Sequence, residues 1–321
     1  MRKFEALGQS LWREAPWLRE CEFRPYPDTP TQWARTFLVR RASGRPAAVL
    51  RKINLSRVTA SDVRAEFEVA ARLGREQLGP AVIAADTAAG ELLMAHIDAQ
   101  SAVRPNRSIV AEAARVLRQL HAVAPDEALA LHKSKRRVGI DRIRGEVGAS
   151  PELRRYQIGM RAYDDLRGKL SRGRGIRALC HNDLNPTNML VSRDRVWLID
   201  FDHVGMGDVF FDVATAAGAL QLTSDAAGNF LEDYLGRTAT ADEMTRFRGM
   251  SRLVLLRYGL DTLSLITGCR RRAVQQAEDY PLGVPFVFDR LPGEELDAAV
   301  ARLSRAFLEA GIAAHWSEGG R

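Results

Sequence analysis

A short polar segment at residues 181–190, HNDLNPTNML, contains side chains that can carry chemistry. It holds a histidine, an aspartate and several asparagines, and it leads directly into the apolar run MLV. A second apolar run, VWLI, follows the polar turn SRDR and precedes Asp200. We interpret the two runs as the strands of a β-hairpin. Folding of this hairpin would bring Asn188 and Asp200 together.

These residue types at this spacing indicate phosphoryl transfer. The amide oxygen of Asn188 and the carboxylate of Asp200 are ligands of the kind that Mg²⁺ prefers. Asp183 lies five positions before Asn188, where it could accept the proton of an attacking hydroxyl. Protein kinases use the same order of a base, a metal-binding asparagine and, after a hairpin, an Asp-Phe pair.

The wider motifs, HNDLNPTNML and LIDFDHVGMGDVFFDVAT, resemble the aminoglycoside phosphotransferase and choline kinase superfamily, which shares the protein-kinase-like fold. Within it, HNDLNP and IDFD-x-x-GMGD most resemble the bacterial choline/ethanolamine kinase branch. The resemblance implies that Asp183 is the catalytic base and that Asn188 and Asp200 bind magnesium. It also implies that His181 braces the loop and that Asp212 holds the loop through its backbone amides.

Several neighbouring residues have more than one interpretation. Asp212 could instead be a helix-start carboxylate favoured by the helix dipole. Asp202 could support the metal site, contact a cationic substrate or be solvated in a loop. We interpret His203 as a loop histidine, His121 in RVLRQLHAV as a packed structural histidine, and Cys180 as a buried small apolar residue.

The first third of the chain has the pattern of a small β-rich lobe with one helix. The expected strands lie at residues 36–41, 47–55, 81–86 and 91–97. The helix between them begins near Ser61 or Asp62, either of which could cap it, and Gly79-Pro80 ends it.

A nucleotide would bind in this lobe. Arg51 and Lys52 both suit the α- and β-phosphates, but adjacent strand residues point to opposite faces, so one of them enters the cleft. The resemblance favours Arg51, with Glu66 rather than Glu68 as its acidic partner. It also places adenine against the backbone of Ala95 to Ile97.

The phosphate-covering hairpin is irregular, because the segment RPYPDTP before it contains no glycine. Side chains of Thr31, Gln32 and Arg35 could substitute for backbone amides there.

The acceptor side is defined by fewer residues. The segment RFRGMSRLVLLRYGLDTLSL offers Tyr258 and Asp261, but its arginines outnumber its single acid. A quaternary ammonium prefers an aromatic box with a nearby acid. We expect a choline- or ethanolamine-like alcohol; thiamine, an aminoglycoside or an anionic acceptor stay open.

The length of 321 residues allows two lobes. We expect an α+β, protein-kinase-like chain with a nucleotide-binding lobe at 1–97, a hinge at 98–107 and a larger, mostly helical catalytic and substrate-binding lobe at 108–321. The cofactors would be ATP and Mg²⁺, and the partner a small-molecule alcohol. A nucleotide-binding pseudokinase or scaffold is the alternative from another class.

The formal net charge of +7 favours anionic ligands such as nucleotide phosphates. No nucleic-acid-binding motif accompanies it, and the basic run at 132–174 is typical of a solvated face. Three separated cysteines and the lack of a signal-like or membrane-spanning apolar run lead us to expect a cytoplasmic protein.

Overall fold

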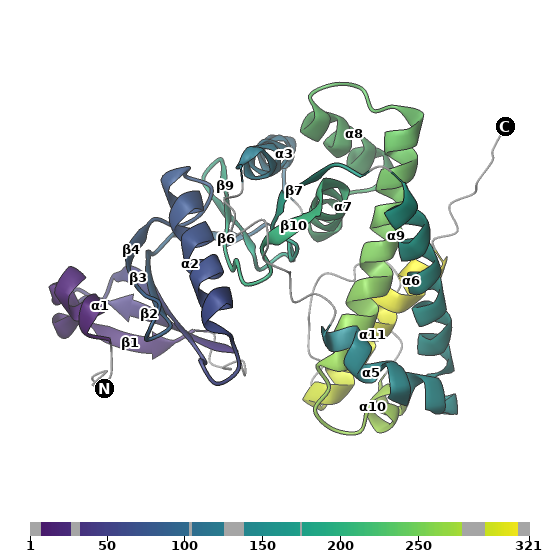
Figure 1. Cartoon of the computed structure of the whole chain (residues 1–321), viewed down its shortest axis with the longest axis horizontal. Helices are drawn as coiled ribbons and strands as arrows, with labels where there is room; N and C mark the ends of the chain where they lie inside the picture. Colours follow the sequence, from purple (N-terminus) through teal and green to yellow (C-terminus); the bar gives the residue numbers. More distant parts are fainter. Residues whose placement is uncertain are drawn as a thin grey trace.

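A five-stranded antiparallel sheet forms most of the N-terminal lobe (Figure 1). Its strand order is β1-β2-β3-β5-β4, and neighbouring strands along the chain are mostly neighbours in the sheet. The strands are β1 (Glu22–Pro25), β2 (Ala34–Arg40), β3 (Pro46–Ile53), β4 (Val82–Asp86) and β5 (Glu91–Ala95). The structure is a computed structural model that describes residues 8–26, 33–102, 105–124, 138–173, 175–277 and 293–313.

The sheet is covered on both faces. Helix α1 (Gln9–Glu14) and the 3₁₀ helix η1 (Pro16–Glu20) pack on its outer face, where they bury Phe37, Leu50 and Leu93. Helix α2 (Ala60–Arg75) belongs to the main core of the molecule. The four expected strands are therefore present, with ends shifted by at most two residues.

The start of α2 differs from the expectation. The side chain of Thr59, not Ser61 or Asp62, caps the helix, because its hydroxyl accepts the backbone N–H of Asp62 at 3.2 Å. The helix ends at Arg75, and a turn at Gln77, which has a positive φ of 56°, leads to Gly79.

Short strands lie in the middle of the molecule (Figure 1). The expected hairpin is present as β8 (Met189–Ser192) and β9 (Arg195–Leu198), and β6 (Gln100–Ser101) adds a third strand to it. The segment expected to be a hinge thus includes a strand. A second antiparallel pair, β7 (Arg177–Cys180) and β10 (Gly205–Asp208), was not expected, because it includes the glycine-rich sequence GMGD.

Helices form the rest of the C-terminal lobe, on the side away from the large sheet (Figure 1). They are α3 (Arg107–Ala122), α5 (Val138–Ala149), η2 (Pro151–Leu153), α6 (Arg154–Arg172), α7 (Val209–Ala219), α8 (Ser224–Leu235), α9 (Ala241–Ser264), α10 (Arg270–Gln276) and α11 (Leu296–Ala313).

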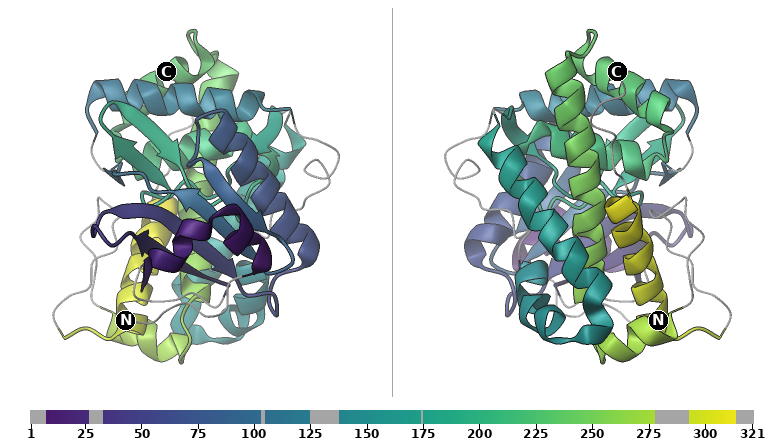
Figure 2. Two further views of the ribbon diagram at one scale, coloured as in Figure 1. Left: turned by 90° about the vertical axis from the view of Figure 1, so that its left-hand side faces the viewer. Right: turned by 90° about the vertical axis from the view of Figure 1, so that its right-hand side faces the viewer.

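Long helix α9 lies beside α6 and α11 (Figure 2). The backbones of α9 and α11 approach closely: a Cβ on Gly259 would lie 2.9 Å from the backbone nitrogen of Leu308. Glycine is needed there because any larger residue would separate the two helices. The contacts of α11 fix the central part of α9.

The larger of the two clusters of buried residues that the structure describes runs from α2 and the inner strands into the helical lobe. In the part of the chain that the structure describes, no helix is both long and apolar enough to cross a bilayer. The α+β arrangement of a small sheet-rich lobe and a larger helical lobe is confirmed. The lobe boundaries at residues 97 and 108 stay a prediction.

Candidate active site

Asp212, in the first turn of α7, holds the backbone of the loop between β7 and β8. The Asp212 carboxylate accepts the backbone N–H of His181 at 2.6 Å through Oδ2 and that of Asn182 at 2.8 Å through Oδ1. The side chain of Asp212 is fully buried. The contact that the resemblance implies for this residue is therefore present, and the loop conformation depends on it.

Asn182 adds a constraint that the sequence did not reveal. Its backbone has a positive φ of 71°, a region that asparagine tolerates better than most residues. Its side-chain amide donates to the carbonyls of His203 at 2.9 Å and Gly205 at 3.1 Å. The loop before β8 is thereby joined to the loop before β10. In the sequence, the only hint of this contact is the asparagine at the second position of HNDLNP.

His181 connects the same loop to the end of the hairpin. Its buried ring donates from Nε2 to the carbonyl of Ile199 at 2.9 Å, and its Nδ1 accepts the backbone N–H of Asp183 at 3.3 Å. These two bonds together require the neutral tautomer with the proton on Nε2. The ring also packs beside Phe201, with centroids 5.5 Å apart. This geometry suits a positioning role, not proton transfer.

Asn188 lies next to Asp183. Its side-chain nitrogen donates to the Asp183 carbonyl at 2.8 Å and approaches Oδ2 of Asp183 at 3.2 Å, so its amide oxygen faces away from the base. The backbone N–H of Ile199 donates to the Asn188 carbonyl at 3.1 Å, which extends the hairpin pairing to the residue before Asp200. Asp200 itself has a positive φ of 63°. Hairpin pairing thus brings the two expected metal ligands to one end of β8 and β9.

Arg51 on β3 faces these acids. Its guanidinium lies 2.6 Å from Oε1 of Glu66, 2.9 Å from Oδ1 of Asp200 and 3.8 Å from Oδ2 of Asp202. Burial opposes the charge on Arg51, but Asp200 and Glu66 outweigh it and raise its pKa. Burial, and next the charge of Asp200, raise the pKa of Asp202 well above its ordinary value. The expected partner Glu66 is therefore observed, and Asp202 belongs to the same charged group.

Lys52 lies on the other face of the sheet. Its ammonium pairs with the fully buried Glu91 at 2.7 Å. Arg35 is the direct cross-strand partner of Lys52, while Thr36 is that of Arg51. Because directly paired residues project to the same face, the structure does not bring Arg35 to the cleft. The expectation for Arg35 is corrected, and Thr36 takes its place on the cleft face.

The structure modifies one further predicted nucleotide contact, at Ala95, and leaves the others untested. The backbone N–H of Ala95 donates to the carbonyl of Ala81 at 2.8 Å, so it is not free for adenine. Ile97 follows the end of β5 and stays a predicted adenine contact. The predicted contacts of Thr31 and Gln32 lie outside the described residues.

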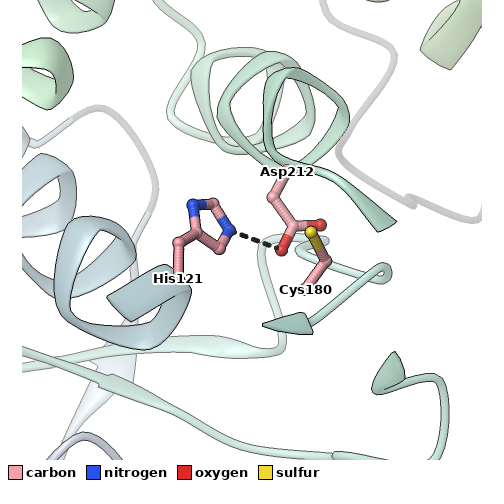
Figure 3. A group of neighbouring side chains, drawn as sticks. All are labelled: His121, Cys180 and Asp212. Atoms are coloured by element: carbon pink, nitrogen blue, oxygen red, sulfur yellow. Dashed lines mark hydrogen bonds and ion pairs between the residues drawn. The ribbon is translucent and has the colours of Figure 1, made fainter. Parts of the chain in front are cut away.

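A cluster of His121, Cys180 and Asp212 lies beside the loop between β7 and β8 (Figure 3). The Nε2 of His121 donates to Oδ2 of Asp212 at 3.2 Å, and Nδ1 lies 2.8 Å from the hydroxyl of Tyr234. The thiol of Cys180 lies within 4.8 Å of both the His121 and Asp212 ligand atoms. Such residues can bind a metal, but the oxygens of Asp212 already accept the loop amides. We therefore interpret the cluster as a hydrogen-bonded brace, which agrees with structural roles for His121 and Cys180.

The two residues predicted for the acceptor side, Tyr258 and Asp261, both lie on α9. The Tyr258 hydroxyl donates to Oδ1 of Asp183 at 3.0 Å. Asp261 pairs with Arg257 at 2.8 Å between Nε and Oδ2, so its charge is already balanced. Of the two, Tyr258 reaches the candidate base directly, while Asp261 is part of an intrahelical ion pair.

A cavity of about 520 Å³ lies elsewhere, between α7, α8 and α9. Its lining includes Ala217, Met244 and Phe247, and it includes none of the candidate site residues. We assign the function to the polar cluster around Asp183, because that is where groups with chemical capability converge.

A family model described as the phosphotransferase enzyme family matches residues 31–250, which is more than half of the chain. The chain belongs to this family. The match includes the loop, the hairpin, Arg51 and Asp212. The candidate site residues other than Tyr258 and Asp261 therefore lie within the matched region.

Comparisons with individual proteins agree with the family. Protein LicA of Haemophilus influenzae is 44% identical over 59 residues, which are 18% of this chain and 22% of that protein. The match thus spans about a fifth of the length of this curated relative.

Two solved structures have the same fold. A choline/ethanolamine kinase family protein from Mesorhizobium loti has 19% identity and a TM-score of 0.63 over 91% of this chain and 88% of that one. Choline kinase LicA from Streptococcus pneumoniae has 18% identity and a TM-score of 0.61 over 94% and 97%. At these identities the similarity shows the fold, which is the two-lobed, protein-kinase-like fold.

Proposed function

We propose that this protein transfers the γ-phosphate of ATP to a hydroxyl group of a small molecule. The observation that carries the proposal is the convergence of Asp183, Asn188, Asp200 and Arg51 at one end of the β8–β9 hairpin. Membership of the phosphotransferase enzyme family supports the same reaction class.

Five residues of the site have distinct roles in the proposed reaction. Asp183 accepts the proton of the acceptor hydroxyl while the hydroxyl oxygen bonds to the γ-phosphorus. The bond between the γ-phosphorus and the bridging oxygen breaks, and ADP leaves with that oxygen. Arg51, held by Glu66, binds the nucleotide phosphates. Asp212 and His181 keep the loop in position.

The oxygen ligands of Asn188 and Asp200 fit a magnesium ion. Both are hard donors, and the hydrogen bond from the backbone N–H of Ile199 to the carbonyl of Asn188 holds them at the same end of the hairpin. When bound, Mg²⁺ neutralises charge on the phosphates. The positive φ of Asp200 directs this carboxylate to a position that an ordinary strand residue would not reach.

For the acceptor, we propose a choline- or ethanolamine-like alcohol. The support is the nature of the relatives, which are named as a choline/ethanolamine kinase family protein and a choline kinase. The pairing of Asp261 with Arg257 leaves this acid neutralised, so a cationic acceptor would need a different counter-charge. The acceptors that the sequence left open, which are thiamine, an aminoglycoside or an anionic alcohol, are included in the test.

The test measures ADP release from MgATP with a panel of choline, ethanolamine, thiamine, aminoglycosides and phosphorylated alcohols. We expect one class of acceptor to stimulate release. Asp183→Asn should lower that rate by about 10²–10⁴-fold, the usual contribution of a general base, while nucleotide binding persists. The matched control is Asp194→Asn, an exposed aspartate in the turn of the same hairpin, which should keep the full rate.

A pseudokinase is the alternative, because Arg35 faces away from the cleft and the segment before β2 contains no glycine. ATP binding without ADP release on any acceptor would favour this alternative. Full activity in Asp183→Asn would instead show that Asp183 is not the general base.

A further inference from the structure

Tyr258 contacts the candidate base from a distant part of the chain. Its hydroxyl, on α9, donates to Oδ1 of Asp183 at 3.0 Å although the two residues are 75 positions apart. The other carboxylate oxygen, Oδ2, is approached by the side-chain nitrogens of Asn185 and Asn188, each at 3.2 Å. Asp183 is thus held from both sides by hydrogen-bond donors of the protein.

The Tyr258 ring is itself held in place. It packs against Phe307 of α11, with ring centroids 5.4 Å apart and planes at 31°. Phe307 is buried, and α11 is fixed on α9 by the close backbone approach at Gly259. The position of the hydroxyl is therefore set by helix packing and requires no bound acceptor.

Neighbouring residues on α9 strengthen this support. Arg257 pairs with Asp261 one turn further along and lies over the ring of Phe211 on α7, 5.3 Å from its centroid. Because Phe211 precedes Asp212, the same turn of α7 contacts α9 and holds the loop that carries the base. The base, the loop support and Tyr258 thus rest on one packed unit of α7 and α9.

We propose that Tyr258 is a positioning residue for Asp183, and that its hydroxyl orients Oδ1 for proton acceptance instead of forming part of an acceptor pocket. This inference rests on the proposed function, in which Asp183 is the base. A carboxylate oxygen can accept more than one hydrogen bond, so Oδ1 keeps capacity for the acceptor hydroxyl while Tyr258 stays bound. Fixing the carboxylate in advance lowers the cost of reaching a reactive geometry.

The test is Tyr258→Phe, which removes the hydroxyl and leaves the ring against Phe307. We expect kcat to fall about tenfold or more, the effect of losing one hydrogen bond to a charged group. The KM values for acceptor and ATP should change less than about twofold, because ground-state binding is not affected. Hydrolysis of ATP without acceptor should fall by the same factor as kcat, since water would use the same base.

An acceptor-binding role would give a different result. The KM for the acceptor would rise while kcat and acceptor-independent hydrolysis stayed at the wild-type values, and this would overturn the proposal. Unchanged kinetics throughout would overturn it as well. Thermal unfolding of Tyr258→Phe close to that of the wild type would show that the loss of rate is not a loss of fold.

The matched control is Tyr156→Phe. This tyrosine on α6 is buried, and its hydroxyl accepts a hydrogen bond from Ser304 at 3.1 Å. We expect wild-type turnover, because this hydroxyl contacts helix α11 and not the base. Asp183→Asn is measured in parallel: an active Asp183→Asn contradicts the proposed function, whereas an inactive Asp183→Asn with a fully active Tyr258→Phe contradicts only the role of Tyr258.

Discussion

Arg51 and Lys52 are adjacent in the sequence but bind carboxylates on opposite faces of the N-terminal sheet. Arg51 meets Glu66 and Asp200, whereas Lys52 meets Glu91. Strand alternation explains why one residue enters the cleft. The sequence favours Arg51 only by resemblance, and the structure supports this choice because Arg51, unlike Lys52, lies beside Asp200. The phosphate contact itself stays a prediction.

This difference predicts separate effects on nucleotide binding. Arg51→Met should raise the Kd for MgATP about tenfold or more, since a charge-assisted phosphate contact contributes about 1.4 kcal/mol or more. Lys52→Met is the matched control, because it also removes the cation beside a buried carboxylate, but on the other face. We expect a Kd near that of the wild type. Calorimetric titration of MgATP measures both, and equal losses in the two variants would contradict the assignment of Arg51.

Local sequence predicted part of this site well. Asp183, Asn188 and Asp200 come together through one loop and one hairpin, so their spacing contains the information. Tyr258 could be named as an acceptor-side residue, but its bond to Asp183 spans 75 positions and depends on helix packing. The link from Tyr234 to His121 spans 113 positions and had no local signal. The error at Arg35 arose because strand register, which sets the face, is not readable from a single strand.

At the scale of elements, α9 carries Tyr258 and begins with a capping box. The hydroxyl of Thr240 accepts the backbone N–H of Glu243 at 3.2 Å, and Oε2 of Glu243 accepts that of Thr240 at 2.9 Å. Arg237 also pairs with Glu243 at 2.7 Å. The pair with Arg237, followed by the bond from the Thr240 amide, lowers the pKa of Glu243 to about 2.

The lowered pKa predicts how stability depends on pH. A carboxyl whose pKa is lower in the folded state stabilises the fold above its ordinary pKa, which is 4.5 for Glu243, and loses this effect as pH falls toward 2. Glu243→Gln should therefore lower the free energy of unfolding at pH 7 by about 0.5 kcal/mol, as for a surface pair. The difference from the wild type should shrink below pH 4.5. Urea unfolding at several pH values measures it.

A double-mutant cycle with Arg237→Gln provides the control. Once Arg237 is absent, Glu243→Gln should change stability much less. A cost of Glu243→Gln that stays constant from pH 7 to pH 3 would show that the charge of this carboxylate does not stabilise the start of α9.

The helices and strands differ in how well the sequence pattern predicts them. Four strands of the large sheet, β2 to β5, were expected because their apolar patterns are strong, whereas β1 was not expected. The four-residue strands β7 and β10 were missed, because GMGD has the composition of a turn and gains strand geometry only from pairing with residues 177–180. The cap at Thr59 was missed since several polar residues precede α2 and each could fill that position.

At the scale of the whole molecule, the two lobes are joined beside the active site. The backbone N–H of Leu198 donates to the carbonyl of Leu78 at 2.8 Å. A Cβ on Gly79 would lie 2.9 Å from the ring of Phe201, so glycine permits this close approach. The ion pair of Arg51 and Asp200 also connects the lobes. A ligand that binds residues of both lobes should therefore stabilise the complete chain.

This leads to a prediction for magnesium. MgATP at about 100 times its Kd should add about 2.7 kcal/mol to the free energy of unfolding, visible as a rise in Tm. In the wild type, ATP with EDTA should give a smaller rise, because the proposed ligands Asn188 and Asp200 would then lack the metal that would neutralise the phosphates. Asp200→Asn should show nearly the same rise with and without magnesium.

Each variant is compared with its own ligand-free Tm, since Asp200→Asn also removes the ion pair with Arg51. A magnesium-dependent rise in Asp200→Asn equal to that of the wild type would mean that the metal binds elsewhere, and the hairpin would then bring Asp200 to Arg51 for structural reasons alone.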